Sequence, residues 1–308
     1  MPTILITGGT GLVGKALTTL LLQKGYTVII LTRKLPVGDQ QPGVQFALWN
    51  VKKQTIDIAA LQRADYIIHL AGAGVMDKKW SPEYKNEIIS SRVESAKLLV
   101  HTLKNNPNTI KAVVSSSAIG WYQVVPVVHT EEEPADDSYL GHTCKLWEES
   151  IAGVEELGKR LVKLRTGIVL SKEGGALKEF ITPQKLGIAA ILGTGKQMVS
   201  WIHIDDLCAM YVAAIENEQL TGAYNAVAPG PVSNKTLTLT LAKKRNGSLY
   251  IPVHIPGFVL KLMLGDRSVE ILKDLTVSCK KILATGFSFR FADIDAALDN
   301  LVNSTDRR

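Results

Sequence analysis

The stretch "ILITGGTGLVGKAL", residues 4 to 17, decides the fold. It begins as an apolar run typical of a buried strand and continues, over residues 12 to 24, with the apolar spacing of a helix. Between them, Gly8, Gly11 and Gly14 stand at Gly-x-x-Gly-x-x-Gly spacing. A strand, a glycine turn and a helix in this order are the context in which such a motif binds a dinucleotide. The alternative is a glycine turn that serves packing alone.

Glycine suits this chemistry for physical reasons. The turn is tight, a side chain would keep the backbone away from a diphosphate, and the helix N-terminus offers partly positive N–H groups. We therefore predict cofactor contacts at these residues of the turn and of the first helical turn: Gly8, Thr10, Gly11, Leu12, Val13 and Gly14.

Short runs rich in Val and Ile alternate with helical stretches through the first half of the chain. Such runs, with little charge, are typical of strands buried on both faces of a parallel sheet. Helical spacing occurs at residues 12 to 24 and at about 82 to 104. We predict an α/β fold, a Rossmann-like doubly wound parallel sheet. The predicted strands are residues 3–7, 27–32, 44–48, 66–71 and 111–117.

The pattern changes after residue 170, where a segment rich in Gly and Lys begins. We predict an NADP-binding domain at residues 1–170 plus about 200–228, and a smaller α+β lobe at 171–199 plus 229–303. The cleft between two such parts is the expected place for a small substrate.

Composition excludes several classes of protein. The chain has 308 residues, 46% of them hydrophobic and 21% charged, which is typical of a soluble globular protein. Its net charge of +6 is scattered, so we expect no nucleic-acid partner. The three cysteines are far apart, and we interpret them as reduced thiols without a zinc site. With no signal peptide and no membrane-spanning run in the sequence, we expect a cytoplasmic protein.

The residues after the second predicted strand bear on cofactor choice. An NAD-preferring site usually has an acidic residue near this point, which accepts the ribose 2'-hydroxyl. Here stand Thr32, Arg33 and Lys34. Because a guanidinium can pair with a 2'-phosphate, we predict NADP(H) over NAD(H). The alternative is two solvated cations after a strand.

These motifs resemble the extended short-chain dehydrogenase/reductase superfamily, which includes sugar-nucleotide epimerases. The closer resemblance is to its atypical epimerase-like branch, the YfcH type, and it covers the chain almost from end to end. Each motif is modest alone, but their order and spacing are specific. The matching stretches are "ITGGTGLVG", "LTRK", "HLAG", "SRVES", "SSSAIGWY", "LRTGIVL", "GGAL", "GTGKQMVSWIHIDDL", "NAVAP" and "LATGFSFRF".

The resemblance implies an NADP-binding domain and a C-terminal lobe without assigned chemistry. In "HLAG", small residues would let the backbone pass close to the ribose and nicotinamide half. From the sequence alone, Glu87 and Arg92 lie five apart on different faces of a helix, and a surface ion-pair residue is the alternative for each. Asn50 departs from the Asp common at that place. The contacts implied or expected here are Thr32, Arg33, Lys34, Leu70, Ala71, Gly72, Glu87, Arg92, Ser115 and Val169.

Members of the superfamily place a Ser or Thr after the fifth strand and a Tyr-x-x-x-Lys pair on the next helix. Ser117 matches the serine position, with a strand-end Ser bonded to backbone as the alternative. The Lys ammonium is needed because a free Tyr has a pKa near ~10. The nearest pair, Tyr139 and Lys145, is six apart and so does not share a helical face.

Neither register of that helix completes the pair. One register puts Leu140 and Cys144 in the two positions, and the next puts Gly141 and Lys145 there. We keep Tyr139 as a candidate catalytic acid, with a packing aromatic as the alternative.

Other residues are candidates for the substrate cleft: Trp121, Tyr122, Gln197 and Trp201. Tyr122 is also a second candidate proton donor, and a core position is the alternative for Trp201. His203 in "WIHIDDL" lacks further ligands for a metal site.

Two functions follow. The first is an NADP(H)-dependent, epimerase-like oxidoreductase that acts by hydride transfer on an unknown small substrate, as a monomer or homodimer. The second is an NADP(H)-binding sensor or interaction protein with little catalysis, since the Tyr/Lys pair is missing.

Overall fold

The fold is built on an eight-stranded sheet, seen in a computed structural model that describes residues 1–38 and 41–303. The strand order is β14-β8-β6-β5-β1-β2-β3-β4, and all neighbours are parallel except β3 and β4. This arrangement confirms the predicted α/β class. The strands are β1 (Thr3–Thr7), β2 (Thr27–Thr32), β3 (Val44–Asn50), β4 (Thr55–Ile56), β5 (Tyr66–His69), β6 (Ala112–Ala118), β8 (Arg160–Thr166) and β14 (Gly222–Ala226).

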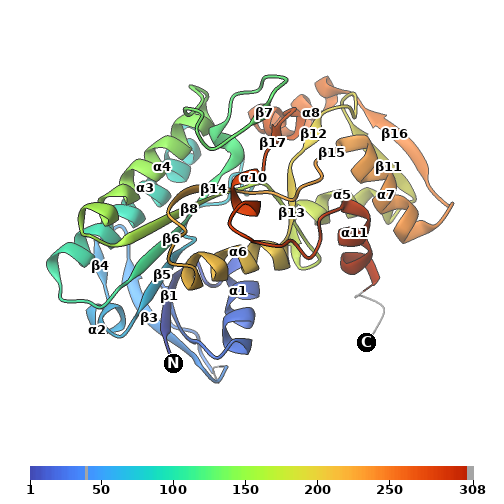
Figure 1. Cartoon of the computed structure of the whole chain (residues 1–308). Helices are drawn as coiled ribbons and strands as arrows, with labels where there is room; N and C mark the ends of the chain where they lie inside the picture. The colour runs from blue at the N-terminus through green and yellow to red at the C-terminus, as the bar shows by residue number, and fades with distance from the viewer. Residues whose placement is uncertain (39–40, 304–308) are drawn as a thin grey trace.

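Helices cover both faces of this sheet, as Figure 1 shows. On one face, α1 (Leu12–Gln23) and α6 (Ile204–Glu216) pack with the strands in one apolar core. On the other, α2 (Ile58–Gln62), α3 (Pro82–Asn105) and α4 (Tyr139–Glu156) form a second core. The central strands have no solvent-facing side, which explains their unbroken Val and Ile runs.

The apolar run at residues 161–170 contributes to two strands. They are β8 and β9 (Ile168–Ser171), with Gly167 between them. A Cβ at Gly167 would stand 2.5 Å from the Ser200 carbonyl oxygen, and the Gly167 N–H donates the last hydrogen bond of the β8–β14 pairing to the Ala226 carbonyl at 3.1 Å. The chain therefore turns away from the large sheet, and β9 pairs with β10 (Gly174–Gly175) and β13 (Trp201–His203).

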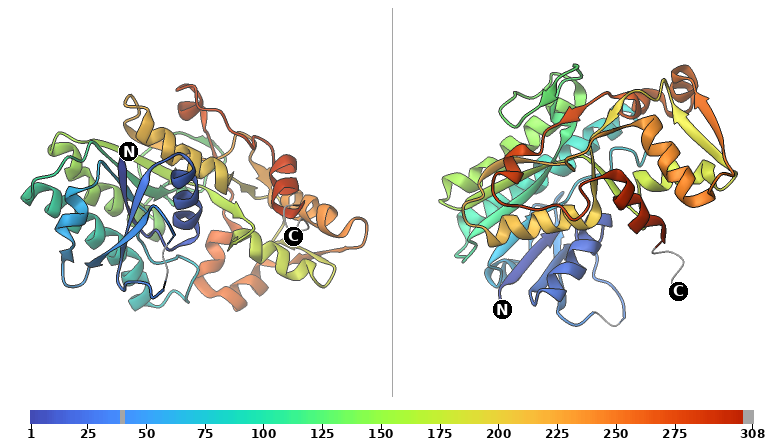
Figure 2. Two further views of the ribbon diagram at one scale, coloured as in Figure 1. Left: turned by 90° about the horizontal axis from the view of Figure 1, so that it is seen from below. Right: turned by 45° about the vertical axis from the view of Figure 1, so that its right-hand side comes forward.

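A smaller lobe packs beside the sheet domain (Figure 2) around a third apolar core. Its two-stranded parallel sheet pairs β11 with β16, and β12 pairs with β15. Its elements are α5 (Ala176–Gln184), β11 (Ile188–Leu192), β12 (Met198–Val199), β15 (Val232–Ser233), α7 (Asn234–Asn246), β16 (Ile251–Ile255), α8 (Gly257–Leu264), η2 (Gly265–Arg267), α9 (Ser268–Leu272) and α11 (Ile294–Asn303).

The segment at residues 275–289 returns to the sheet domain. In it, β17 (Thr276–Val277) pairs with β7 (Val128–His129), which follows the short helix η1 (Ile119–Trp121), and α10 (Lys280–Leu283) contacts β14. Leu275 and Ile282 belong to the same core as α1 and α6. Part of the predicted C-terminal lobe therefore packs with the large sheet.

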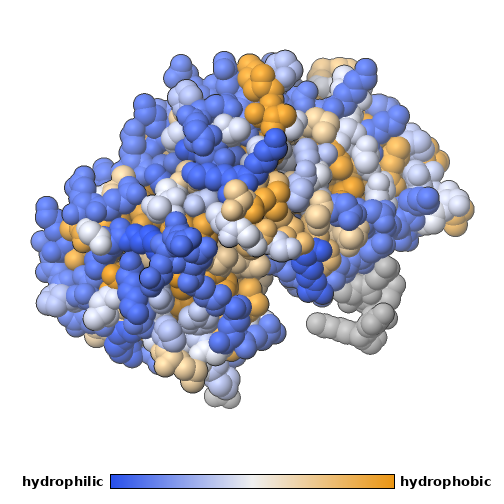
Figure 3. All heavy atoms as spheres, viewed as in Figure 1, coloured by the Kyte–Doolittle hydropathy of each residue, from blue (hydrophilic) through white to orange (hydrophobic). Residues whose placement is uncertain are grey.

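The surface is mainly hydrophilic, and the cysteines are enclosed. Hydrophilic residues are spread over the face shown in Figure 3. Cys144, Cys208 and Cys279 are all free thiols and all buried. Within the described residues, no helix combines the length and the apolar character needed to cross a bilayer.

Candidate cofactor site

The glycine loop between β1 and α1 forms a cradle of bare backbone. Gly8 has φ +70°, and a Cβ there would stand 2.9 Å from the Leu70 carbonyl carbon. A Cβ at Gly14 would stand 2.5 Å from the Gly8 oxygen. Gly11 is the N-cap of α1, and no side chain caps the helix, so its first N–H groups are not engaged by a capping side chain. These features are what a diphosphate site at a helix N-terminus requires.

A hydroxyl fixes the end of β5 against this loop. The Thr7 hydroxyl oxygen accepts the N–H groups of Leu70 and Ala71, each at 3.2 Å. With both acceptor positions used, Thr7 donates its proton to His69 Nδ1 at 2.7 Å. Burial, aided by the positive charge of Arg92, lowers the pKa of His69 to about 3. His69 is thus a neutral ring that orients the Leu70–Ala71 backbone.

The end of β2 presents two cations. Thr32 donates to the Lys34 carbonyl at 2.9 Å and so fixes the turn after the strand. Arg33 and Lys34 are exposed, and neither side chain has an ion pair or hydrogen bond among the described residues. Asn50, at the end of β3, accepts the Lys53 N–H at 3.0 Å. The positive charge at Arg33 and Lys34 is therefore available to an anionic group.

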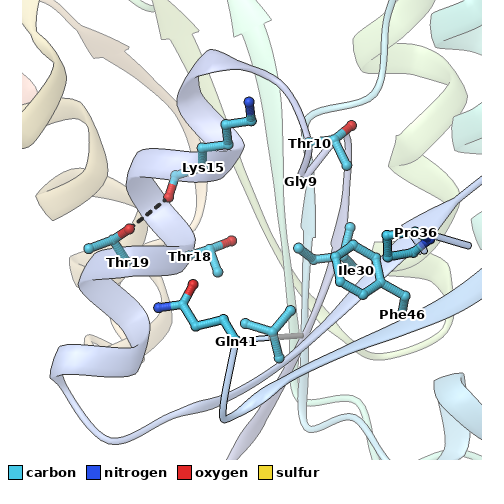
Figure 4. Close-up of a pocket in the computed structure, with 10 residues that line it drawn as sticks. Gly9, Thr10, Lys15, Thr18, Thr19, Ile30, Pro36, Gln41 and Phe46 are labelled. Carbon is cyan, nitrogen blue, oxygen red and sulfur yellow. Dashed lines mark hydrogen bonds between the residues drawn. The ribbon is translucent and has the colours of Figure 1, made fainter. Parts of the chain in front are cut away.

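A hollow of about 310 Å³ adjoins the glycine loop (Figure 4). Thr10 and Lys15 lie at its glycine-loop end, while Ile30 and Phe46 line it from the sheet. Lys15 is not among the residues predicted from the sequence. Its position directly after the third glycine, in the exposed first turn of the helix, is the feature that could have indicated it.

Val169 lies near the start of α1, whereas Ser115 is enclosed. The Val169 carbonyl is 3.9 Å from a Cβ built at Gly175, and that Cβ would also stand 3.0 Å from the Leu12 side chain. Ser115 is 1% exposed and donates to the Ser116 carbonyl at 3.1 Å. Its side chain therefore offers no free surface to a cofactor in this structure.

Glu87 and Arg92 are not paired with each other. Exposed Glu87 pairs with Lys78 at 3.2 Å. Arg92 turns the other way, and its Nη1 donates to the carbonyls of Ala73 at 3.0 Å and Ile88 at 2.9 Å. Its guanidinium lies 4.8 Å from the Trp147 ring centroid.

Ser117 belongs to a buried ionic network. It is 3% exposed, and its hydroxyl donates to Glu148 Oε1 at 2.7 Å. Arg165 binds the same carboxylate through two nitrogens, at 2.8 and 3.1 Å. Glu148 therefore shares its charge with a bidentate guanidinium, and the Ser117 proton is already engaged.

The positions of the missing pair face the end of β6. A Cβ at Gly120 would stand 3.4 Å from Leu140 Cβ and 3.6 Å from Cys144 Sγ. Lys145, in contrast, is exposed. Tyr139 donates to the Lys85 carbonyl at 2.9 Å, and partial burial raises its pKa. α4 has no lysine four residues after Tyr139, while Lys85 of α3 has its Nζ 5.4 Å from the Tyr139 ring centroid.

Two candidates for the substrate cleft are core residues instead. Trp201 is fully buried and donates to the Gly230 carbonyl at 2.8 Å. Tyr122 is also fully buried, donates to Asn225 at 2.6 Å, and has its pKa raised to about 12 by burial. A ring without exposed surface cannot line a cleft, so their large apolar faces serve packing.

The remaining candidates also have structural partners. Gln197 is 6% exposed and donates to the Leu192 carbonyl at 3.0 Å. Trp121 donates to the Glu133 carbonyl at 2.8 Å and lies over Arg165. It also borders a second hollow, of about 400 Å³, between α4 and residues 134–137. His203 caps α6 by accepting the Asp205 N–H at 3.0 Å. No cluster of metal-binding side chains occurs in the part of the chain that the structure describes.

Comparison with known proteins places this site in a family. The model of the NAD dependent epimerase/dehydratase family matches residues 4–226, and a domain of unknown function, DUF1731, matches residues 255–301. The chain belongs to the NAD dependent epimerase/dehydratase family. Its glycine cradle and doubly wound sheet lie inside the matched region.

Individual members of the epimerase/dehydratase family are similar over the whole chain. Epimerase family protein YfhF of Bacillus subtilis (strain 168) is 33% identical over 301 residues, 97% of each chain. A human epimerase family protein, SDR39U1 isoform 2, has a crystal structure with NADPH. It matches with TM-score 0.85 and 28% identity over 98% of this chain and 99% of that one. A nucleoside-diphosphate sugar epimerase from Corynebacterium glutamicum matches at 32% identity and TM-score 0.78, over 99% of this chain and 59% of that one.

Proposed function

We propose that the protein binds NADP(H) across the carboxyl end of its sheet. The observation that carries the proposal is the cradle in which a Cβ on Gly8 or Gly14 would strike backbone. The cations Arg33 and Lys34 add to it, since neither side chain has a partner among the described residues. The glycine loop would hold the diphosphate, and Arg33 the 2'-phosphate. The human relative crystallised with NADPH supports the same choice of cofactor.

We further propose an epimerase-like oxidoreductase acting on an unidentified small substrate. The bound cofactor would supply or accept a hydride. Ser117 and Tyr139 are the hydroxyls we propose for the substrate side, and each has a competing bond in this structure. To offer its proton to a substrate oxygen, Ser117 must release Glu148, and Tyr139 must release the Lys85 carbonyl.

A specific observation favours the second function, an NADP(H)-binding sensor or interaction protein. Leu140 and Cys144 occupy the two positions that face the turn after β6, and neither transfers a proton readily. Burial raises the pKa of Cys144 to about 12, so its thiol stays protonated at neutral pH. Cofactor binding would then persist with little turnover.

Cofactor choice is tested by titrating NADPH and NADH into the protein and into Arg33→Ala. We expect Arg33→Ala to weaken NADPH binding by about tenfold or more, because a charged hydrogen-bond pair to the 2'-phosphate is lost, and to leave NADH binding nearly unchanged. Arg245→Ala, an exposed cation on α7, controls for the change in net charge. Equal loss for both cofactors would contradict the assignment of Arg33.

Turnover separates the two functions. The protein with NADPH is offered a panel of aldehydes, ketones and nucleotide sugars, and NADPH oxidation is followed by absorbance. Oxidation that Ser117→Ala abolishes supports the oxidoreductase. Tight NADPH binding with no oxidation across the panel supports the binding protein.

A further inference from the structure

Glu270 and Lys273 form a partly buried ion pair in the smaller lobe. Lys273 Nζ lies 2.7 Å from Glu270 Oε1, and the side chains of Lys273 and Glu270 are 10% and 20% exposed. The Lys273 ammonium itself has almost no contact with solvent, and Glu270 is its one carboxylate partner within the described residues. Because an ion pair removed from water adds little net stability, its surroundings decide what it does.

The helix that carries the pair, α9, is tied to the segment that follows β5. Directly before α9, Asp266 pairs with Lys85 of α3 at 3.3 Å, and Arg267 Nη1 donates to the Met76 carbonyl at 2.8 Å. The segment that holds Met76 starts at the carboxyl end of β5, where the backbone meets the glycine loop at Gly8. The lobe is therefore attached to the end of the sheet that forms the cofactor cradle.

The charges of the pair also act on α4 and on the residues just before it. Burial raises the pKa of the Cys144 thiol, and the Lys273 ammonium opposes that rise. Asp136 in turn raises the pKa of Glu270. Cys144 faces the end of β6, since a Cβ at Gly120 would stand 3.6 Å from its Sγ. Position 144 is where the lysine of a Tyr-x-x-x-Lys pair would stand, so the lobe brings an ammonium and a carboxyl group close to that position.

The carboxyl group of Glu270 is suited to proton transfer. Burial raises its pKa above that of an exposed glutamate, the Lys273 ammonium opposes this rise, and the charge of Asp136 adds to it. The Cys144 thiol, whose pKa burial raises to about 12, is a far weaker acid. A carboxyl group with a raised pKa can both give and take a proton closer to neutral pH.

We propose that Glu270 is the acid–base group of the reaction and that Lys273 positions its carboxylate, in place of the Tyr/Lys pair that α4 lacks. This inference rests on the proposed NADP(H)-dependent oxidoreductase. In the reducing direction, the carbonyl carbon of the substrate accepts the hydride of NADPH, the C=O π electrons move to oxygen, and that oxygen takes the proton of Glu270. The products are an alcohol, NADP⁺ and the Glu270 carboxylate, which the Lys273 ammonium stabilises. Oxidation of an alcohol follows the same steps in reverse.

The first measurement needs no substrate. Glutamate carboxyl groups are labelled with carbon-13 and titrated by NMR in the unaltered protein and in Glu270→Gln, which identifies the Glu270 signal by its absence. We expect this signal to titrate above the ordinary pKa of a glutamate, ~4.3. In Lys273→Met it should titrate at a still higher pH, because the charge that stabilises the carboxylate is gone. An ordinary midpoint in the unaltered protein would overturn the inference.

The second measurement is turnover with NADPH and the same panel of aldehydes, ketones and nucleotide sugars. We expect Glu270→Gln to lower kcat by about a hundredfold or more and to leave the Kd of NADPH unchanged, because only proton transfer is lost. In Lys273→Met, the pH above which kcat/KM falls should rise together with the NMR midpoint. The matched control is Glu94→Gln, since Glu94 pairs with Lys97 at the same spacing on the exposed surface of α3. It should change neither quantity.

The outcomes separate this inference from the function on which it rests. Melting temperatures identify any variant that fails to fold. If Glu270→Gln does not fold, Glu270→Asp replaces it and should also lower kcat, because its shorter side chain holds the carboxyl group farther from the substrate. Turnover at the unaltered rate in the folded variant contradicts the inference and leaves the oxidoreductase standing. If the unaltered protein binds NADPH but reduces no member of the panel, the oxidoreductase proposal fails and this inference fails with it.

Discussion

At the scale of single residues, His69 links the cofactor cradle to stability. Its ring is fully buried, accepts a hydrogen bond from Thr7 and has its pKa lowered to about 3 by burial and by Arg92. In the unfolded chain the same imidazole has a pKa near ~6.5. Between these two values the unfolded chain binds a proton that the folded protein does not.

We therefore expect the free energy of unfolding to fall as the pH drops from about 6.5 toward about 3, by at most ~1.4 kcal/mol per pH unit from this group. The sign follows because the unfolded state holds more protons in this range. His69→Asn keeps an acceptor near Thr7 and removes the titration, so its stability should depend less on pH. The measurement is urea unfolding at a series of pH values.

His101→Asn is the matched control, because His101 is exposed on α3. The decisive quantity is the difference in unfolding free energy between the unaltered protein and each variant, followed across pH. A difference for His69→Asn that stays constant from pH 7 to pH 4 would show that folding does not lower the pKa of His69.

At the scale of secondary-structure elements, one ionic network joins two strands and a helix. Glu148 of α4 binds Arg165 of β8 and Ser117 of β6, and both charged side chains are almost fully buried. Arg165 also donates to the Glu131 carbonyl at 3.1 Å and to Tyr122 at 3.2 Å. The network holds the loop after β6 in place, so its removal should loosen the substrate side of the sheet.

Arg165→Met should destabilise the protein by about 3–5 kcal/mol, because buried Glu148 loses its bidentate partner and keeps only Lys163, whose Nζ lies 3.9 Å from Oε2. Arg165→Met with Glu148→Leu should cost much less, since the buried carboxylate is removed together with its partner. Both values come from urea unfolding followed by circular dichroism. If the double variant is no more stable than Arg165→Met, shape and packing around the guanidinium, and not charge balance, hold these elements together.

The sequence predicts the strands and the glycine loop, but not the ion pair that joins β8 to α4. The strands could be predicted because burial on both faces demands long apolar runs, and the glycine loop because only glycine fits its backbone. The Glu148–Arg165 pair could not, since its members are 17 residues apart on different elements and look like ordinary surface charges in the sequence. Tyr122 and Trp201 were candidates for the substrate cleft but lie in the core. The sequence could not separate these two places, because an aromatic residue is equally typical of both.

At the scale of the whole molecule, the two parts are tied by a segment that returns to the large sheet. Asn225 at the end of β14 donates to the Ser278 carbonyl at 3.0 Å, and Lys281 donates to the Ala223 carbonyl at 2.9 Å. The predicted boundary at residue 229 missed this return, because a short strand and a short helix near the chain end resemble the lobe in composition. Residues 275–289 therefore pack in the core of the sheet domain, while the lobe has a core of its own.

Asp206 in α6 also connects the two parts of the molecule. Its two carboxylate oxygens accept the N–H groups of Arg290 at 2.8 Å and of Phe291 at 3.0 Å, where the chain leaves the sheet domain for α11. Because both parts share this connection, we expect thermal unfolding in a single transition. Circular dichroism should report it at the same temperature as fluorescence from Trp49 in the sheet core and Trp201 in the lobe core.

Asp206→Ala leaves the N–H groups of Arg290 and Phe291 without their acceptor, and the Phe291 contact is buried. We expect the free energy of unfolding to fall by about 1–3 kcal/mol for each N–H group left unsatisfied. Asp205→Ala, at the adjacent exposed position, is the control and should change stability far less. Two separate melting steps in the unaltered protein would show that the two parts unfold independently. A single step with equal effects of the two substitutions would show that the parts unfold together but that Asp206 does not join them.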